Sequence, residues 1–145
     1  MRYLLDTCVI SELVKRRPEA RVANWIDGRD ERSLFLSVLT FGEIEKGIAR
    51  LSDEQRRREL RDWVDHELRR RFSGRIMPVD YETASRWGCI SGAAERTGHP
   101  LPVLDAMLAA TALIHGLTLV TRNTADVSTT GVSVVNPWAE HVPGA

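Results

Sequence analysis

The chain has 145 residues and a mass of 16.3 kDa, which suits one compact domain over residues 1–145 rather than two independent cores. Hydrophobic residues make up 43% and charged residues 28% of the sequence, a balance typical of soluble globular proteins that excludes a disordered chain. Basic and acidic residues number 20 each, so the net charge is zero and the chain has no overall basic coat for nucleic acid.

The basic residues bear on the kind of partner, and the cysteines bear on the cellular compartment. Only Lys15 and Lys46 are lysines, and the resulting arginine bias is compatible with a phosphate-rich partner, although a GC-rich genome would produce the same bias. Cys8 and Cys89 offer no disulfide framework, which favours a reducing cytoplasm. Because Asp6 interrupts the apolar start of the chain, and no apolar run reaches the roughly 20 residues of a membrane helix, we expect a cytoplasmic protein without membrane contact.

Short apolar runs alternate with segments whose apolar residues recur at helical spacing. The runs predict strands over residues 3–5, 34–37, 75–79, 117–120 and 132–135. The other segments predict helices over residues 7–14, 18–26, 40–51, 53–71, 80–98 and 103–114. This alternation, with continuously apolar strands, predicts an α/β fold: an α/β/α sandwich around a mostly parallel central sheet.

Four acidic residues lie just past predicted strands. Asp6 follows the first strand directly, and Glu43 lies in the first turn of the helix after the second. Asp105 begins the apolar 103–114 helix, where a carboxylate is costly to bury unless it is paired or binds a metal. Asp126 follows the 117–120 strand. Since ligands of open parallel sheets bind beyond the carboxyl ends of the strands, these four acids predict a shared site.

Each acid also has a purely structural explanation. Asp6 would cap the helix that follows it, and Glu43 would complete a capping box with Thr40. Asp105 would complement a helix dipole, and Asp126 would be a solvated loop residue. The common position of the four, rather than any one of them, favours the functional interpretation.

Converging carboxylates repel one another, and a hard divalent cation relieves that repulsion. Ligation by oxygen alone favours Mg²⁺, or Mn²⁺, over zinc. The histidines show no metal-ligand spacing, at His66, His99, His115 and His141. An acidic Mg²⁺ site suits phosphodiester hydrolysis, because the cation activates a water and neutralises phosphate charge.

Polar and basic residues near the acids are candidates for positioning the water or the phosphate. These residues are Thr7, Thr121, Asn123 and the rim residue Arg122, although turn and cap chemistry explains the polar ones equally well. The 53–71 helix carries seven arginines interspersed with six acids, a pattern that favours an exposed, salt-bridged face over an RNA-contacting one.

Several motifs occur along nearly the whole chain in a characteristic order. They are LDTCVISEL at 5–13, GEI with KGI at 42–48, LPVLDAMLAATA at 101–112, LVTRN at 119–123 with Asp126, and NPW at 136–138. Together they resemble the PIN domain, and more narrowly the VapC-type and FitB-like toxins of toxin–antitoxin pairs. Two positions depart from that pattern: Cys8 stands where the family often has Asn, and Val127 where it often has Phe.

The resemblance implies a toxin that acts as a Mg²⁺-dependent endoribonuclease on an RNA substrate. It makes Asp6, Glu43, Asp105 and Asp126 the catalytic and metal-binding acids, with Thr7 and Asn123 as supporting polar residues. It also implies a homodimer and a cognate antitoxin, through which alone operator DNA would be bound.

Two other interpretations remain. The chain would be a toxin-fold subunit of a DNA-binding repressor complex with little or no nuclease activity, as FitB-like relatives suggest. Alternatively, it would be another α/β protein with an acidic site. A haloacid dehalogenase-like phosphatase is disfavoured because Cys8 stands where it needs a second Asp, and a receiver domain because no lysine follows Lys46.

Overall fold

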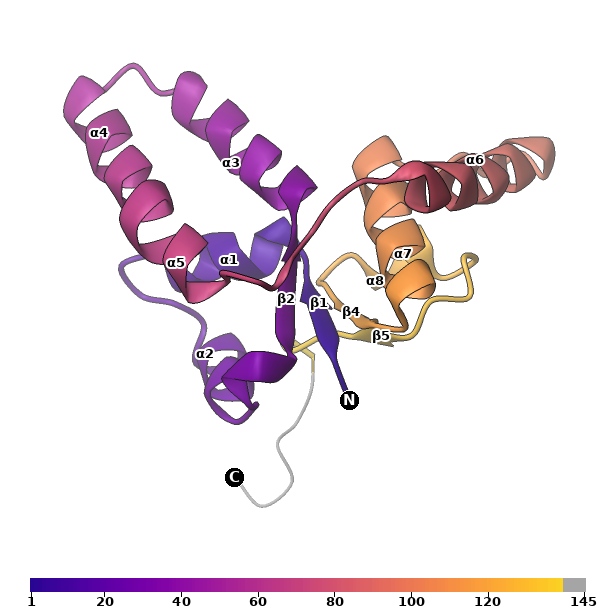
Figure 1. Cartoon of the computed structure of the whole chain (residues 1–145), viewed down its shortest axis with the longest axis horizontal. Helices are drawn as coiled ribbons and strands as arrows, with labels where there is room; N and C mark the ends of the chain where they lie inside the picture. The colour runs from indigo at the N-terminus through magenta and orange to yellow at the C-terminus, as the bar shows by residue number, and fades with distance from the viewer. Residues whose placement is uncertain (140–145) are drawn as a thin grey trace.

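The computed structural model describes residues 1–139 and contains one five-stranded sheet between two groups of helices (Figure 1). All paired strands are parallel, and their order across the sheet is β3-β2-β1-β4-β5. The strands are β1 (Tyr3–Leu5), β2 (Leu34–Ser37), β3 (Ile76–Met77), β4 (Thr118–Val120) and β5 (Val134–Val135). The predicted α/β fold is confirmed.

The helices connect these strands on both sides of the sheet (Figure 1). Between β1 and β2 lie α1 (Thr7–Leu13), α2 (Ala20–Asp27) and the short 3₁₀ helix η1 (Glu31–Ser33). Between β2 and β3 lie α3 (Val38–Ala49), α4 (Glu54–Trp63), the π-helical η2 (Val64–Leu68) and α5 (Arg69–Arg71). The remaining helices are α6 (Tyr81–Arg96), α7 (Val103–His115) and α8 (Thr124–Val127).

The central strand, β1, lies at the point where the strand order reverses. Tyr3 is in register with Leu34 of β2 on one side and with Thr118 of β4 on the other. The chain adds β2 and β3 on the first side and then returns to add β4 and β5 on the second. A crevice therefore forms beyond the carboxyl ends of β1 and β4, the usual ligand position in such sheets.

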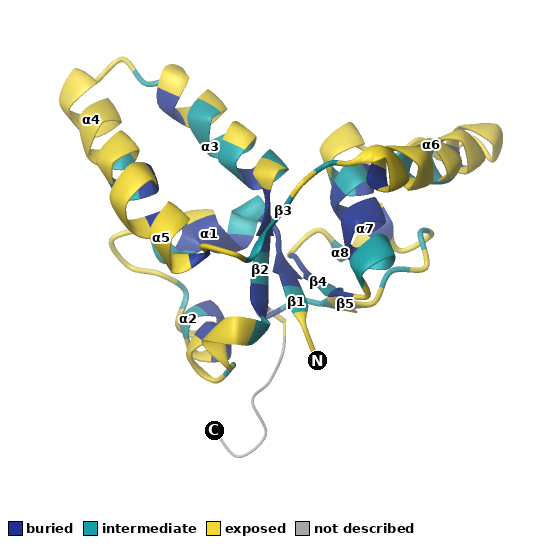
Figure 2. Cartoon of the chain, viewed as in Figure 1, coloured by how far each residue is buried: buried dark blue, intermediate teal, exposed yellow. Residues whose placement is uncertain are grey.

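Successive β1 side chains enter two separate hydrophobic cores, because side chains alternate across a strand. Leu4 packs with Leu108 and Ala109 of α7, whereas Leu5 packs with Val9 of α1. Both leucines are fully buried, and the central strands are buried while the outer helix faces are exposed (Figure 2). The sheet is thus covered on both faces, and its strand ends are fixed by packing.

Several boundaries differ from the sequence prediction, and three of them have a clear physical reason. Helix α3 begins at Val38 with Ser37 as its N-cap, so Thr40 is not a cap. Strand β3 ends at Met77 because Pro78 has no N–H group to continue the ladder. Strand β5 is limited to Val134–Val135, the two residues that pair with Leu119 and Val120 of β4.

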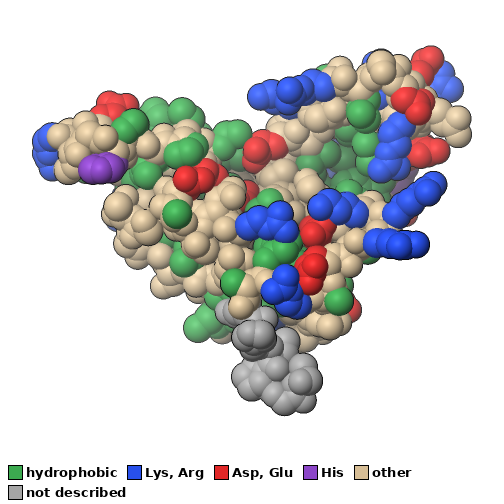
Figure 3. Space-filling model, turned by 180° about the vertical axis from the view of Figure 1, so that it is seen from behind, with side chains coloured by type: hydrophobic (Ala, Val, Ile, Leu, Met, Phe, Trp, Pro, Cys, Tyr) green, Lys and Arg blue, Asp and Glu red, His purple; other side chains and the backbone are tan. Residues whose placement is uncertain are grey.

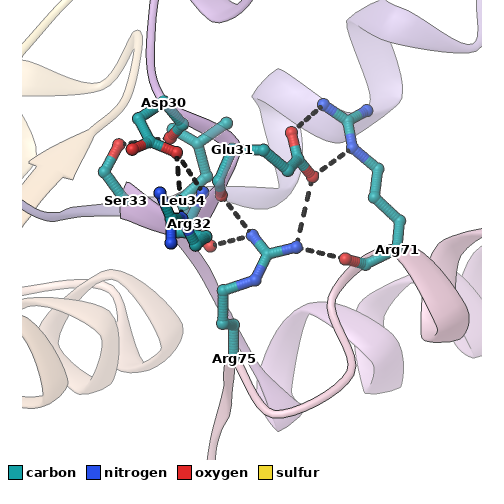
Figure 4. A network of polar contacts seen from close by, with 7 residues as sticks. All are labelled: Asp30, Glu31, Arg32, Ser33, Leu34, Arg71 and Arg75. Carbon is teal, nitrogen blue, oxygen red and sulfur yellow. Dashed lines mark hydrogen bonds and ion pairs between the residues drawn. The ribbon is translucent and has the colours of Figure 1, made fainter.

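An ionic network fixes β3 to the segment that precedes β2 (Figure 4). The Arg75 guanidinium donates to the carbonyl oxygens of Glu31 at 2.5 Å and Leu34 at 2.6 Å, and to the carbonyl of Arg71. The Glu31 carboxylate accepts from Arg71 Nε at 2.8 Å and Arg75 Nη2 at 3.2 Å. This network orders the edge of the sheet where β3 supplies only two residues.

The exposed face of α4 is salt-bridged, as predicted. Arg58 Nη2 lies 3.1 Å from Glu54 Oε1 within the helix, and Arg61 Nη1 lies 3.0 Å from Glu45 Oε2 of α3. These pairs compensate much of the charge that the arginines would otherwise present to a polyanion.

The molecule has two arms that rise from the sheet: one is formed by α3 and α4 and the other by α6 and α7 (Figure 1). As a solid surface the arms enclose a V-shaped notch with acidic side chains near its base (Figure 3). Lys and Arg side chains gather mainly on the α3–α4 side (Figure 3). No helix among residues 1–139 combines the length and apolar character that crossing a bilayer requires.

Candidate active site

Asp6 lies at the carboxyl end of β1 and is only 6% exposed. Its backbone N–H donates to the Val120 carbonyl at 2.9 Å, which extends the β1–β4 ladder by one residue. One carboxylate oxygen, Oδ1, accepts from the Thr7 N–H at 2.6 Å, and Oδ2 accepts from Thr121 Oγ1 at 2.7 Å. Asp6 therefore is the N-cap of α1, as its structural explanation predicts. In addition, Thr121, which follows β4, fixes the Asp6 carboxylate at the point where the strand order reverses.

Glu43 reaches the same position from α3. Because α3 begins at Val38, Glu43 lies in its second turn, and the capping box with Thr40 predicted as an alternative does not form. Instead, Thr7 Oγ1 donates to Glu43 Oε1 at 2.5 Å and lies 3.1 Å from Thr40 Oγ1. The Thr7 side chain thus connects two of the predicted acids, since Thr7 directly follows Asp6.

Asp105 is the electrostatic centre of the acidic group. Partial burial is the largest cause that raises its pKa, followed by the negative charges of Asp6, Asp126 and Glu43 and by hydrogen bonding to Asp126; together they raise it to about 6. Asp105 lies in the first turn of α7, so it also complements the helix dipole. These shifts require the four carboxyl groups to lie within electrostatic reach of one another.

Asp126 is exposed and lies on the short helix α8. Val127, which departs from the family pattern, is 2% exposed and belongs to the core cluster with Leu108 and Leu119. That buried valine anchors α8 at this edge of the molecule. Asn123 is the N-cap of α8, and its N–H donates to Thr121 Oγ1 at 3.0 Å.

The chemistry of this donor set fits a hard divalent cation. All four side chains offer carboxylate oxygens, the ligands that Mg²⁺ and Mn²⁺ prefer. The pKa of Asp105 is raised first by burial and then by neighbouring negative charges, and a cation would compensate those charges. Among residues 1–139, no three His, Cys, Asp or Glu side chains lie close enough together to form a ready-made metal cage.

Cys8 is adjacent to this site but is chemically inert. Burial, and then the charge of Asp6, raise the pKa of its thiol to about 11, so the sulfur is protonated at neutral pH. Its Sγ lies 3.9 Å from Thr121 Oγ1. It packs against the site without serving as a nucleophile.

A second polar cluster lies beside the site, and sequence reasoning missed two of its members, Glu12 and Trp138. Glu12 is 5% exposed, and its Oε1 accepts from Trp138 Nε1 at 3.2 Å. Its Oε2 lies 2.6 Å from Lys15 Nζ, and the Arg122 guanidinium stacks 4.3 Å from the centre of the Trp138 ring. The available signal was that Glu12 lies on the apolar face of α1, three residues after the buried Val9.

An apolar cavity of about 270 Å³ opens next to Thr7 and Glu43. It lies between α1, α3 and α4, and its floor includes Ile10, Ile44 and Trp63. The acidic site therefore has an apolar flank on the α3–α4 side.

The fold and the acids define an α/β protein with an acidic site at the carboxyl edge of a parallel sheet. The sequence matches the PIN domain family over residues 3–128, and the chain belongs to that family.

Individual relatives are similar over most of their length. The chain is 33% identical over 135 residues to VapC ribonuclease Y4jK of Sinorhizobium fredii, covering 93% of this chain and 96% of the relative. It is 35% identical over 135 residues to Toxin FitB of Neisseria gonorrhoeae, covering 93% and 97%. The structure of FitAB bound to an IR36 DNA fragment superposes with a TM-score of 0.89 at 33% identity, covering 97% of this chain and 99% of that chain.

Proposed function

We propose that this protein is the toxin of a toxin–antitoxin pair and acts as a Mg²⁺-dependent endoribonuclease. One observation carries the proposal: four acids from four separate segments meet electrostatically at Asp105, beyond the carboxyl ends of β1 and β4. The relatives named as a VapC ribonuclease and as Toxin FitB support the reaction class and the biological role.

Each acid has a distinct role in this proposal. Asp6 and Asp105 would hold the principal cation, with Glu43 and Asp126 completing its oxygen ligands. A bound Mg²⁺ supplies Lewis-acid activation of a water and compensates charge on the phosphate oxygens. Because the Asp6 carboxylate is already held by hydrogen bonds, the more exposed acids adjust to it rather than the reverse.

The neighbouring polar residues orient these acids and the RNA. Thr121 and Thr7 donate hydrogen bonds to Asp6 and Glu43, which keeps both carboxylates aimed at one point. Asn123 and Arg122 follow Thr121 on the exposed rim, where their side chains would contact the RNA phosphates.

RNA cleavage by the purified protein tests the proposal. We expect cleavage with Mg²⁺ or Mn²⁺ and none in EDTA, and we expect Asp105→Asn to reduce the rate by at least about 100-fold. The matched control is Asp62→Asn, the same change on the exposed face of α4. Equal cleavage in EDTA, or an unaffected Asp105→Asn protein, would refute the metal-dependent mechanism.

We further propose that a cognate antitoxin covers the site, and that operator DNA is bound only through that partner, with the toxin as a cytoplasmic homodimer. The structure of FitAB with DNA supports a DNA-binding partner. It also favours the second candidate function, a repressor subunit with little nuclease activity. Growth arrest on expression without the partner, cured by Asp105→Asn, would support the nuclease; no arrest together with no RNA cleavage would support the repressor subunit.

A further inference from the structure

We propose that Arg122 binds an RNA phosphate next to the scissile one, and that Trp138 and Glu12 are positioning residues that hold its guanidinium in place. The inference rests on the proposed ribonuclease function and adds a substrate contact outside the acidic site.

Arg122 is attached to the site through its backbone and held by its side chain. It directly follows Thr121, whose hydroxyl binds the Asp6 carboxylate. Its Cζ lies 4.3 Å from the centre of the Trp138 ring, and its Nη2 lies 4.0 Å from Glu12 Oε1. Trp138 is in turn fixed by its own Nε1 hydrogen bond to Glu12. The guanidinium therefore has a defined position rather than sampling solvent freely.

Stacking leaves the guanidinium able to bind an anion. The Arg122 Cζ lies over the Trp138 ring, and the five N–H donors of a guanidinium lie in its own plane, so contact with one ring leaves donors available. The Arg122 side chain remains 54% exposed. A stacked arginine of this kind can still donate two parallel hydrogen bonds to a phosphate.

The charges also leave Arg122 available. Within the described residues 1–139, Glu12 is the acid that pairs with Arg122, but Lys15 Nζ lies 2.6 Å from the same carboxylate, well inside the 4.0 Å separation from Arg122. One carboxylate thus faces two cations, and one positive charge is left over. Glu12 orients the arginine without neutralising it.

The position of the cluster along α1 indicates which phosphate is bound. Asp6 caps the start of α1, and Glu12 lies near its end. Six residues of α-helix separate the two levels by about 9 Å. Because Arg122 Nη2 lies beside Glu12 rather than at the start of α1, we assign to it a neighbouring phosphate of the same strand rather than the phosphate at Asp6.

RNA binding by non-cleaving protein tests this assignment. In an Asp105→Asn background, fluorescence anisotropy with a labelled single-stranded RNA of about a dozen nucleotides would measure Kd at several salt concentrations. We expect Arg122→Gln to weaken Kd about 5- to 20-fold, and to lower the slope of log K against log salt by about 0.7, the value for one lost phosphate contact on single strands. The matched control is Arg32→Gln, which removes the same charge before β2, at the opposite end of the strands. It should change Kd only slightly and leave the salt slope as in the parent protein.

A positioning role for Trp138 makes its own prediction. Trp138→Phe keeps a ring face for stacking and should retain most of the affinity, whereas Trp138→Leu should weaken Kd and add nothing further in the Arg122→Gln protein. If Arg122→Gln lowers only the unfolding temperature and leaves Kd and the salt slope unchanged, Arg122 only stabilises the fold. The inference then fails, while the proposal of metal-dependent cleavage is unaffected. A wild-type chain that neither cleaves nor binds RNA would overturn both proposals.

Discussion

At the scale of single residues, the Thr7 hydroxyl determines where the Glu43 carboxylate lies. The 2.5 Å hydrogen bond between them is the direct side-chain link from the β1–α1 junction to α3. Removing a group that orients a metal ligand in this way typically lowers metal affinity or activity about 10- to 100-fold.

Thr7→Val removes that hydroxyl with little change in shape. We expect the Mg²⁺ concentration for half-maximal cleavage to rise about 10-fold or more, and Thr7→Ser to restore it because serine keeps the donor. Mg²⁺ titration of the cleavage rate measures the effect. A Thr7→Val protein with wild-type Mg²⁺ dependence would show that Glu43 needs no such orientation.

Asp105 gives the folded chain a pH dependence in metal-free buffer. Its pKa in the folded protein, about 6, lies above the ordinary aspartate value of 3.8, so folding favours the protonated form. The resulting stabilisation is complete below the unfolded-state pKa and is lost as the pH rises through about 6. Ionised Asp105 therefore destabilises the fold at neutral pH.

Replacing this carboxyl tests the pH dependence directly. In EDTA, Asp105→Asn should unfold at a higher temperature than wild type at about pH 7.5, and the difference should shrink towards about pH 4.5. Mg²⁺ should raise the unfolding temperature of wild type but not of the variant. Thermal unfolding at both pH values, with Asp62→Asn as control, makes the measurement; a pH-independent difference would assign the effect to packing instead.

At the scale of elements, the two-residue strand β3 depends on Arg75. Its side chain is 15% exposed and donates to three carbonyl groups, of Glu31, Leu34 and Arg71, that would otherwise lose a partner. The bonds to Glu31 and Arg71 are exposed, but the Leu34 carbonyl is part-buried, and a buried carbonyl left without a hydrogen bond costs about 1–3 kcal/mol. The network therefore contributes more than an ordinary surface ion pair would.

Arg75→Ala should lower the free energy of unfolding by about 1–3 kcal/mol, because the part-buried Leu34 carbonyl loses its donor. Arg32→Ala is the matched control: its side chain is 90% exposed and lies 3.7 Å from Asp30, so we expect a change within about 0.5 kcal/mol. Urea unfolding of both variants measures the difference. Equal small losses would show that β3 is held by packing alone.

The element boundaries show where local sequence signals stop being sufficient. Both Ser37 and Thr40 suit a helix N-cap, and only the end of β2, fixed by its pairing with β1 and β3, selects Ser37. The helix stop at Gly116 was predictable because its left-handed φ of 65° favours glycine. A cap signal thus identifies a helix end well when no strand competes for the same residues.

At the scale of the whole molecule, the sequence was enough to predict the α/β class, the parallel sheet and the segments that carry the four acids. It was not enough to predict which side chains touch. The bond between Thr121 and Asp6 joins residues 115 positions apart, and the bond between Trp138 and Glu12 joins residues 126 apart. The periodicity of apolar residues indicates only which face of a single helix or strand is buried. Hydrogen bonds between residues so far apart in the sequence depend on the strand order, which local patterns do not encode.

Strand β4 pairs with β1 but is synthesised long after it, and this order has a consequence during translation. A growing polypeptide on the ribosome has made Asp6 and Glu43 long before Asp105, and β4 must emerge before Thr121 can lock the first aspartate. Synthesis therefore has to pass Asp126 before the acidic centre can assemble, because domains fold as cooperative units. Products terminated before that residue would lack one of the four acids and, under the proposed function, would not cleave RNA.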